Sequence, residues 1–141
     1  MLALFEIGGT WMRAAASPRP GVITPLGEVP TPLDELAAFV DAMRRLVVPG
    51  AQGVAISIPG GVDPGTRRLR IANVPCLDGV MAAELFEQAL GLPVVLANDA
   101  DCFALAEAGG QSGTVLGLIL GTGLGGGIVV DGRILAGAGG L

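Results

Sequence analysis

Apolar residues occur in short runs along the chain, and glycine- or proline-rich turns separate most of these runs. Runs of four to eight residues that are rich in Val, Ile and Leu and bounded by turn residues are typical of buried strands. The pattern predicts strands at residues 2–7, 11–17, 22–29, 53–58, 93–97, 115–120, 127–130 and 133–135, and a hairpin in the loop that ends at Asn73.

Helical periodicity appears between these strands. Thr31 precedes Pro32 and an amphipathic stretch, so it is predicted to be the N-cap of a helix that ends before Pro49-Gly50. Asp78 is predicted to cap the next helix, and Asn98 the last. The predicted helices cover residues 32–48, about 80–90, and 99–109.

The order of the elements predicts an α/β fold. Three tightly connected strands, followed by helix–strand–helix–strand–helix, indicate a mixed sheet with an antiparallel and a parallel side. The tail then repeats the opening pattern of strand, turn and strand. We therefore expect one domain at residues 1–110, and at 111–141 the first strands of a second, similar domain that is truncated.

Composition narrows the function. The net charge is −5, all eight basic residues are arginines, and no basic patch forms, so nucleic-acid binding is not expected. No apolar run reaches the roughly 18–20 residues of a membrane span, and the N-terminus does not resemble a signal peptide, so we expect a cytoplasmic protein without membrane contact. With no histidine in the chain, acid–base chemistry would fall to carboxylates. Cys76 and Cys102 have no metal-ligand spacing and are expected to be buried free thiols.

Two glycine-rich loops leave strands in the same way, at residues 6–10 (EIGGT) and 120–127 (LGTGLGGG). Successive backbone N–H groups in such loops can form a concave anion site, and the Thr hydroxyl adds a donor. Neither loop is followed by the Gly-Lys-Ser/Thr of a Walker loop. A single loop of this kind would be explained by a tight hairpin alone, whereas the repeat favours a pair of phosphate-binding hairpins.

Polar residues crowd the junction between the strand at 93–97 and the helix that follows. Asn98 as N-cap and Asp101 at the third helical position account for the helix start. Asp99 is not needed for capping, and it lies where open α/β sheets bind ligands, at the carboxyl end of a parallel strand. Asp99 is therefore the candidate catalytic carboxylate.

Four segments, EIGGT, SIPGGVDPGTRRLRIANVPCLDG, LANDADCFALAE and LGTGLGGGIVVDGRI, resemble the ROK family in order and approximate spacing. This family of bacterial sugar kinases and related repressors belongs to the actin/hexokinase superfamily, with a ribonuclease H-like fold. The resemblance implies ATP-dependent phosphorylation of a hexose or N-acetylhexosamine, with Mg²⁺. It also implies a homodimer.

The resemblance assigns roles to individual residues. Asp99 would be the catalytic base, and it would contact the sugar together with Asn98. The loop of Gly60 and Gly61 and the region of Asn73 would border the sugar pocket. The two glycine hairpins would hold the phosphates of ATP through Gly8, Gly9, Thr10, Gly121, Thr122 and Gly123.

The chain departs from the family pattern at Glu6, where Asp is usual. Its longer side chain could still reach Mg²⁺ through a water molecule. The sugar-contacting Glu-x-Gly-His segment and the cysteine-rich zinc site of the family have no counterpart here, so zinc is not assigned to this chain. Since the phosphate clamp needs two complete domains, residues 1–141 alone are expected to be inactive.

Two other functions compete with the kinase. The family's repressors carry an N-terminal DNA-binding helical module, whereas this chain begins at its first strand. A sugar-binding protein that has lost catalysis would explain Glu6. Retention of Asn98, Asp99 and both hairpins favours the kinase, and the identity of the sugar stays open.

Overall fold

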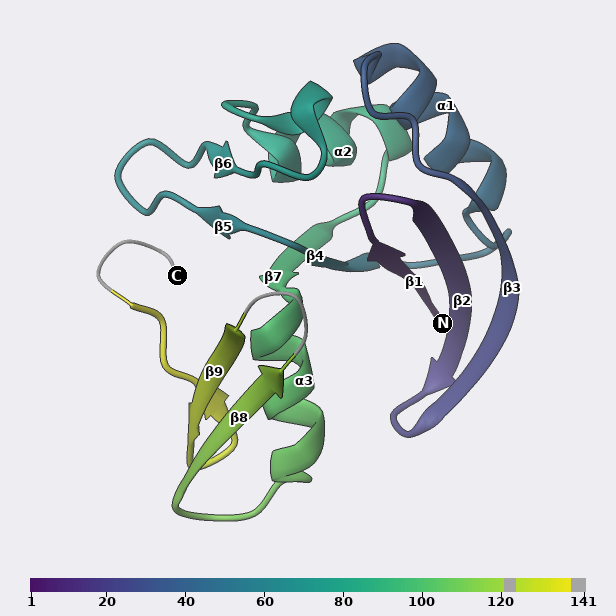
Figure 1. Cartoon of the computed structure of the whole chain (residues 1–141). Helices are drawn as coiled ribbons and strands as arrows, with labels where there is room; N and C mark the ends of the chain where they lie inside the picture. Colours follow the sequence, from purple (N-terminus) through teal and green to yellow (C-terminus); the bar gives the residue numbers. More distant parts are fainter. Residues whose placement is uncertain (121–123, 138–141) are drawn as a thin grey trace.

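A five-stranded mixed sheet forms the centre of the computed structural model, which describes residues 1–120 and 124–137 (Figure 1). Its strand order is β3-β2-β1-β4-β7. The first three strands are antiparallel neighbours, and the other two run parallel to β1. The strand bounds are β1 (Leu2–Ile7), β2 (Trp11–Arg19), β3 (Val22–Pro30), β4 (Val54–Ile58) and β7 (Val94–Asn98). The predicted mixed sheet is confirmed.

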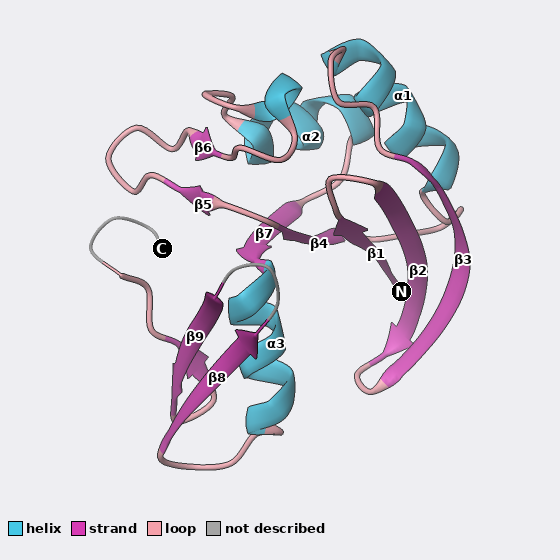
Figure 2. Cartoon of the chain, in the orientation of Figure 1, coloured by secondary structure: helices cyan, strands magenta, loops and turns pink. Residues whose placement is uncertain are grey.

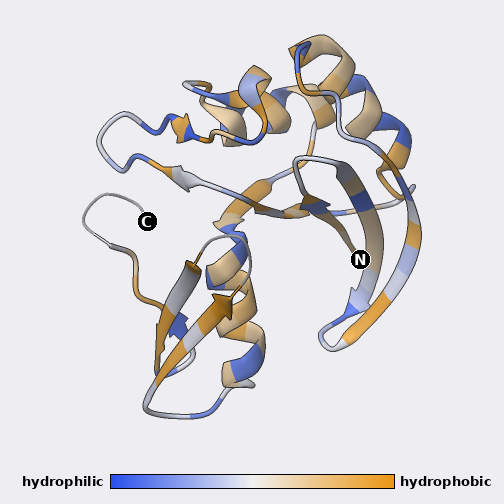
Figure 3. Cartoon of the chain, in the orientation of Figure 1, coloured by the Kyte–Doolittle hydropathy of each residue, from blue (hydrophilic) through white to orange (hydrophobic). Residues whose placement is uncertain are grey.

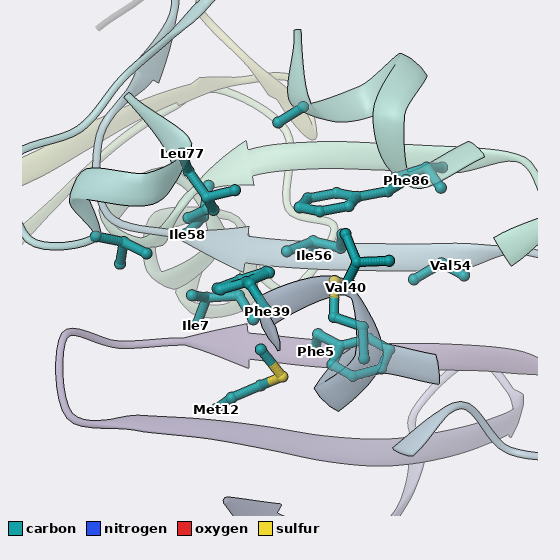
Figure 4. Packing of buried hydrophobic residues seen from close by; sticks show 14 of the residues in the cluster. Phe5, Ile7, Met12, Phe39, Val40, Val54, Ile56, Ile58, Leu77 and Phe86 are labelled. Carbon is teal, nitrogen blue, oxygen red and sulfur yellow. The ribbon is translucent and has the colours of Figure 1, made fainter. Parts of the chain in front are cut away.

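Two helices, α1 (Leu36–Leu46) and α2 (Ala82–Leu90), cover one face of this sheet (Figure 2). Alternate residues of the central strands point toward them, as the period of two in a strand requires. The rings of Phe39 and Phe86 stack with centroids 5.8 Å apart and join the two helices above the sheet (Figure 4). The main core thus lies between this helix pair and the sheet.

A second, three-stranded sheet packs against α3 (Asp99–Ala108), which follows β7 directly. Its strands are β8 (Thr114–Leu120), β9 (Leu124–Val130) and β10 (Arg133–Ile134), in the order β10-β9-β8. Gly117 and Gly127 on the inner face allow the backbones of the sheet and α3 to approach closely. The hydropathy colouring shows that much of β8 and β9 is apolar (Figure 3). The large apolar side chains on the outer face are exposed: Leu116, Leu118, Leu120, Leu124, Ile128 and Val130.

The predicted start of the first helix is wrong. The helix begins at Leu36 rather than at residue 32, and its N-cap is Glu35, whose side chain makes no capping hydrogen bond. Thr31 stays attached to the β1–β2 hairpin instead. Its backbone N–H donates to the carbonyl of Thr10 (2.9 Å), and its hydroxyl donates to the carbonyl of Gly8 (2.7 Å).

The predicted capping role of Asp78 is also wrong. A turn of 3-10 helix, η1 (Pro75–Leu77), comes first, and α2 starts at Ala82. The Asp78 carboxylate accepts the backbone N–H of Ile71 at 3.0 Å and so fixes the loop that carries Asn73. The predicted hairpin before this loop is confirmed as β5 (Gly61–Val62) and β6 (Leu69–Arg70).

Both cysteines are free and partly buried, and burial raises the pKa of each thiol. Across residues 1–120 and 124–137, no helix combines the length and the apolar character needed to cross a membrane.

Candidate functional site

The carboxyl ends of β1, β4 and β7 lie at the same edge of the sheet because the three strands are parallel. Ile58 at the end of β4 pairs with Asn98 at the end of β7. The hairpin after β1, the loop after β4 and the N-terminus of α3 therefore meet at this edge. Open α/β sheets bind their ligands at this kind of edge.

Asn98 connects two of these segments. Its Nδ2 donates to the carbonyl of Gly60 at 2.8 Å. Its Oδ1 accepts the backbone N–H groups of Ala100 (2.9 Å) and Asp101 (3.4 Å), which confirms the predicted N-cap. Because both ends of the amide are engaged, the loop after β4 and the start of α3 are held in fixed relation.

Gly60 has a backbone conformation that other residues rarely adopt, with φ at +107°. A Cβ at this position would also collide with the carbonyl oxygen of Arg70 on β6. Glycine is therefore required here on two grounds. The close approach brings the β5–β6 hairpin over the strand end and narrows the space beside Asn98.

Asp99 lies at the first position of α3 with an exposed side chain. Its Oδ1 accepts the backbone N–H of Ala100 at 2.9 Å. Neighbours in the described part of the chain make no other hydrogen bond to this carboxylate, which leaves an oxygen free toward the solvent-facing edge. An exposed carboxylate with a free oxygen can act as a proton acceptor, and the catalytic role of Asp99 stays a prediction.

Asp101 has a different environment from the one predicted. It lines a pocket of about 250 Å³ together with Gly60, Gly61 and Asn98. Burial raises the pKa of its carboxyl group, and the nearby charge of Asp99 raises it further. The sequence pointed to a capping role for Asp101, and no signal in it distinguished this residue as part of a pocket wall.

The first glycine hairpin contacts the loop of Asn73. The backbone N–H of Gly8 donates to the carbonyl of Trp11 at 2.8 Å and closes the turn. A Cβ at Gly9 would lie 3.3 Å from the carbonyl oxygen of Asn73. The structure thus brings together a segment predicted to bind phosphate and one predicted to border the sugar, while Thr10 at the tip is exposed.

Glu6 precedes this hairpin on β1 and forms an ion pair. Arg13 on β2 donates from Nη1 to Glu6 Oε2 at 3.0 Å and from Nε to Glu28 Oε2 on β3 at 2.9 Å. The hydrogen bond to Glu6 raises the pKa of the Arg13 guanidinium. The residue predicted to approach Mg²⁺ therefore has one carboxylate oxygen engaged by a cation.

The second glycine hairpin is only partly described. Gly121, Thr122 and Gly123, predicted to bind phosphate, lie outside the described residues. The strand that follows them, β9, contacts the site through Gly127, where a Cβ would lie 2.7 Å from Asp101 Oδ1. Two larger hollows, of about 550 and 740 Å³, border α2 away from the strand ends and contain none of the predicted site residues.

Comparison with known proteins agrees with this architecture. The sequence profile of the ROK family matches residues 5–141. The chain is 36% identical over 143 residues to the N-acetyl-D-glucosamine kinase of Aliivibrio salmonicida, covering 94% of this chain and 47% of that protein. The chain thus spans about half the length of the curated relatives it matches.

Two solved structures extend the comparison. A ROK family protein from Streptococcus pneumoniae, crystallised with sucrose, superposes with a TM-score of 0.87 at 30% identity, over 99% of this chain and 49% of that one. A ROK family glucokinase from Streptomyces griseus, bound to glucose and AMPPNP, gives 0.81 at 31% identity, over 97% and 46%. Since the family profile covers almost the whole chain and the fold agrees throughout, the chain belongs to the ROK family.

Proposed function

We propose that the complete protein transfers a phosphoryl group from ATP to a hydroxyl of a hexose or N-acetylhexosamine. The observation that supports this most is the bond from Asn98 to the Gly60 carbonyl, beside the exposed carboxylate of Asp99. It joins two segments with predicted sugar contacts at the edge where α/β sheets bind ligands.

Phosphoryl transfer to an alcohol needs positioning, neutralisation of charge and a carboxylate that takes the hydroxyl proton. In the proposed mechanism Asp99 takes that proton. Asn98 contacts a sugar hydroxyl, and Gly60, Gly61 and Asn73 border the sugar. Because Asp99 is fixed by the first turn of α3, its carboxylate is held ready without a change in the helix.

The hairpins would hold the nucleotide. The backbone N–H of Gly9 and the exposed Thr10 hydroxyl suit phosphate oxygens, while Gly8 would shape the loop, since its own N–H closes the turn on the Trp11 carbonyl. Gly121, Thr122 and Gly123 would contribute from the other hairpin. ATP as donor is supported by the AMPPNP bound to the Streptomyces griseus glucokinase. Residues 1–110 would form one domain and 111–141 the beginning of another, closing on the nucleotide from both sides.

Mg²⁺ would neutralise phosphate charge during transfer. The donor chemistry at Glu6 fits, because Mg²⁺ prefers carboxylate oxygens and keeps most of its ligands as water and phosphate. Within the described ranges, no three side chains of His, Cys, Asp or Glu gather into a metal site of their own. Glu6 would therefore contact the hydrated metal through the oxygen that Arg13 does not bind.

A sugar-binding protein without catalysis is the second candidate, and one observation favours it. The Glu6 carboxylate is already engaged by Arg13, which weakens its use for a metal. A regulator is a third candidate; one ROK family transcriptional regulator of solved structure superposes on this chain with a TM-score of 0.76 at 23% identity, a likeness that shows the fold alone.

A kinase assay separates these functions. The complete protein is incubated with ATP, Mg²⁺ and one sugar of a panel of glucose, mannose, N-acetylglucosamine and N-acetylmannosamine, and ADP release is measured. The proposal expects sugar-dependent turnover with at least one of them. Sugar binding by calorimetry without any turnover would support the non-catalytic candidate instead. Light scattering on the same sample tests the proposed homodimer, and fractionation of the source cells tests the proposed cytoplasmic location.

A further inference from the structure

The pocket beside Asn98 is lined by Asp101, not by Asp99. Asn98 is the other polar side chain in its wall, and most of the remaining lining is apolar, with Ile58, Leu69, Leu96 and Ile134 among it. The Asp101 carboxylate is half-buried in this wall, and even partial burial without a partner disfavours its charged form. The position therefore asks for a reason beyond folding.

Helix capping does not supply that reason. Asn98 already accepts the N–H groups of Ala100 and Asp101 at the start of α3. In a capping box the Asp101 carboxylate would in return accept the backbone N–H of Asn98, and this bond is not formed. Among the described residues, the Asp101 carboxylate has neither a hydrogen bond nor an ion pair.

The carboxylate is nevertheless held in place. The Asp101 backbone is fixed in the first turn through the Asn98 side chain. On the other side lies β9, where a Cβ at Gly127 would come within 2.7 Å of Asp101 Oδ1. The glycine leaves room both for the α3 backbone, since a Cβ would also lie 2.8 Å from the Ala100 carbonyl oxygen, and for the carboxylate between α3 and β9. The structure thus keeps an unpaired acceptor at a defined position in the pocket.

The chemistry of the pocket indicates what would pair with this acceptor. An ionised carboxylate accepts hydrogen bonds and donates none, and apolar walls around it suit the C–H faces of a sugar ring. We propose that Asp101 accepts a hydrogen bond from a hydroxyl of the sugar acceptor and thereby determines which sugars bind. This inference rests on the proposed kinase function and is separate from the role of Asp99.

The raised pKa of Asp101 agrees with an acceptor that lacks its partner. A donated hydroxyl hydrogen bond stabilises the charged form and lowers the pKa again. Sugar binding is therefore expected to release protons near the pKa of Asp101 in the wild type. The Asp101→Asn variant, which lacks this carboxyl group but keeps Asp99, is expected to lose the part of the release that comes from Asp101.

The test combines variants of Asp101 with deoxy sugars and uses the complete protein. For the best sugar, Asp101→Ala is expected to raise KM roughly 10- to 100-fold, the loss typical of a hydrogen bond to a charged group. The KM for ATP is expected to stay the same. One deoxy analogue is expected to bind worse than the parent sugar to the wild type but equally well to the variant, because both changes remove the same bond.

Asp41→Ala is the matched control, since Asp41 is an exposed carboxylate on α1 that pairs with Arg44. It is expected to leave both KM values unchanged. Asp101→Asn keeps the shape of the side chain and serves if Asp101→Ala does not fold; it is expected to lose about tenfold in sugar affinity. If the wild type is active but the wild type and Asp101→Ala discriminate to the same extent between the parent sugar and every deoxy analogue, Asp101 does not contact the sugar. A wild type without turnover on any sugar would instead refute the proposed function.

Discussion

The Arg13 guanidinium on β2 lies 3.0 Å from the Glu6 carboxylate on the neighbouring strand β1. One pair of facing residues, Ile7 and Met12, separates this ion pair from the first glycine hairpin, the candidate phosphate-binding loop. The side chains of Arg13 and Glu6 are about half exposed, at 51% and 56%. An exposed pair of this kind is weak, so a divalent cation can compete with it. Arg13 is therefore expected to tune the affinity of Glu6 for Mg²⁺ rather than abolish it.

Removing Arg13 should accordingly strengthen metal binding. We expect Arg13→Ala to lower the Mg²⁺ concentration for half-saturation roughly two- to fivefold, since the competing exposed pair is lost. Calorimetric titration of Mg²⁺ in the presence of AMPPNP measures this without turnover. Arg45→Ala, an arginine on α1 away from the hairpin, is the control. An unchanged or weaker Mg²⁺ affinity in Arg13→Ala would show that Glu6 does not approach the metal.

Asp99→Asn tests the proposed base. Loss of a general base typically costs about 10²- to 10⁴-fold in rate, so kcat is expected to fall at least 10²-fold. The amide keeps the hydrogen bond from the Ala100 N–H, so the fold and the sugar affinity are expected to change little. Steady-state kinetics together with calorimetric sugar binding check both parts. Near wild-type turnover would remove Asp99 from the catalytic role.

Asp101 is expected to make stability depend on pH. Its folded-state pKa is raised by burial and by Asp99, so its ionised form is disfavoured by folding. The stability that comes from keeping Asp101 protonated is fully present at pH values below the ordinary Asp pKa. It is lost as the pH rises through the raised pKa of the folded state. Asp101→Asn is expected to melt above the wild type near neutral pH, because the amide carries no charge that folding disfavours. This difference should shrink as the pH falls toward the ordinary pKa of Asp.

The melting curves of both proteins between pH 3 and pH 8 measure this effect. A variant that melts below the wild type at neutral pH would mean that Asp101 stabilises α3 as a helix cap. Asp101→Asn is thus expected to gain stability and to lose sugar affinity. This trade-off is common at functional sites, where a side chain serves ligand binding at a cost to the stability of the fold.

Much of this architecture could be predicted from the sequence. The strand pattern and the turns define the mixed sheet, and the Asn98 cap is visible because a good capping residue follows an apolar run directly. The errors at Thr31 and Asp78 share one cause. Each residue has the local sequence of an N-cap, but its side chain is used elsewhere. The Thr31 hydroxyl donates to the carbonyl of Gly8, which is distant in sequence, and the Asp78 carboxylate accepts the N–H of Ile71 across a loop. Local propensity does not encode such contacts.

The site was predictable in part for a similar reason. Glycine loops and polar residues at strand ends mark the edge of the sheet, because strand direction alone brings them together. The environments of Arg13 and Asp101 depend on packing between β2 and β3 and between α3 and β9. Sequence spacing does not fix these distances.

The Thr31 hydroxyl should measurably support the first hairpin. Thr31 is only 8% exposed, and it donates to the Gly8 carbonyl at 2.7 Å. Thr31→Val keeps the shape and removes this bond, at an expected cost of about 1–2 kcal/mol in the free energy of unfolding. Thr31→Ser retains the hydroxyl and should recover part of the loss. Urea unfolding compares the three proteins, and equal stability of Thr31→Val and the wild type would contradict this contribution.

The packing of the second sheet on α3 is expected to depend on Gly117. A Cβ at this position would lie 2.7 Å from the Cβ and 2.8 Å from the Cα of Ala104, which is fully buried in α3. Neither atom can move without displacing the helix, so Gly117→Ala should cost about 1–3 kcal/mol through overpacking.

Gly125→Ala is the matched control on the adjacent strand. Its Cβ would meet Ala100 at an ordinary contact distance of 3.5 Å, and the backbone there is compatible with alanine. We expect the control to unfold at nearly the wild-type urea concentration. Because Asn98 caps the N-terminus of α3, a displaced helix should also weaken the bond from Asn98 to Gly60. Hydrogen exchange at the Ala100 amide, which the Asn98 side chain protects, should therefore accelerate in Gly117→Ala but not in Gly125→Ala. Equal exchange in both variants would show that the second sheet does not position the start of this helix.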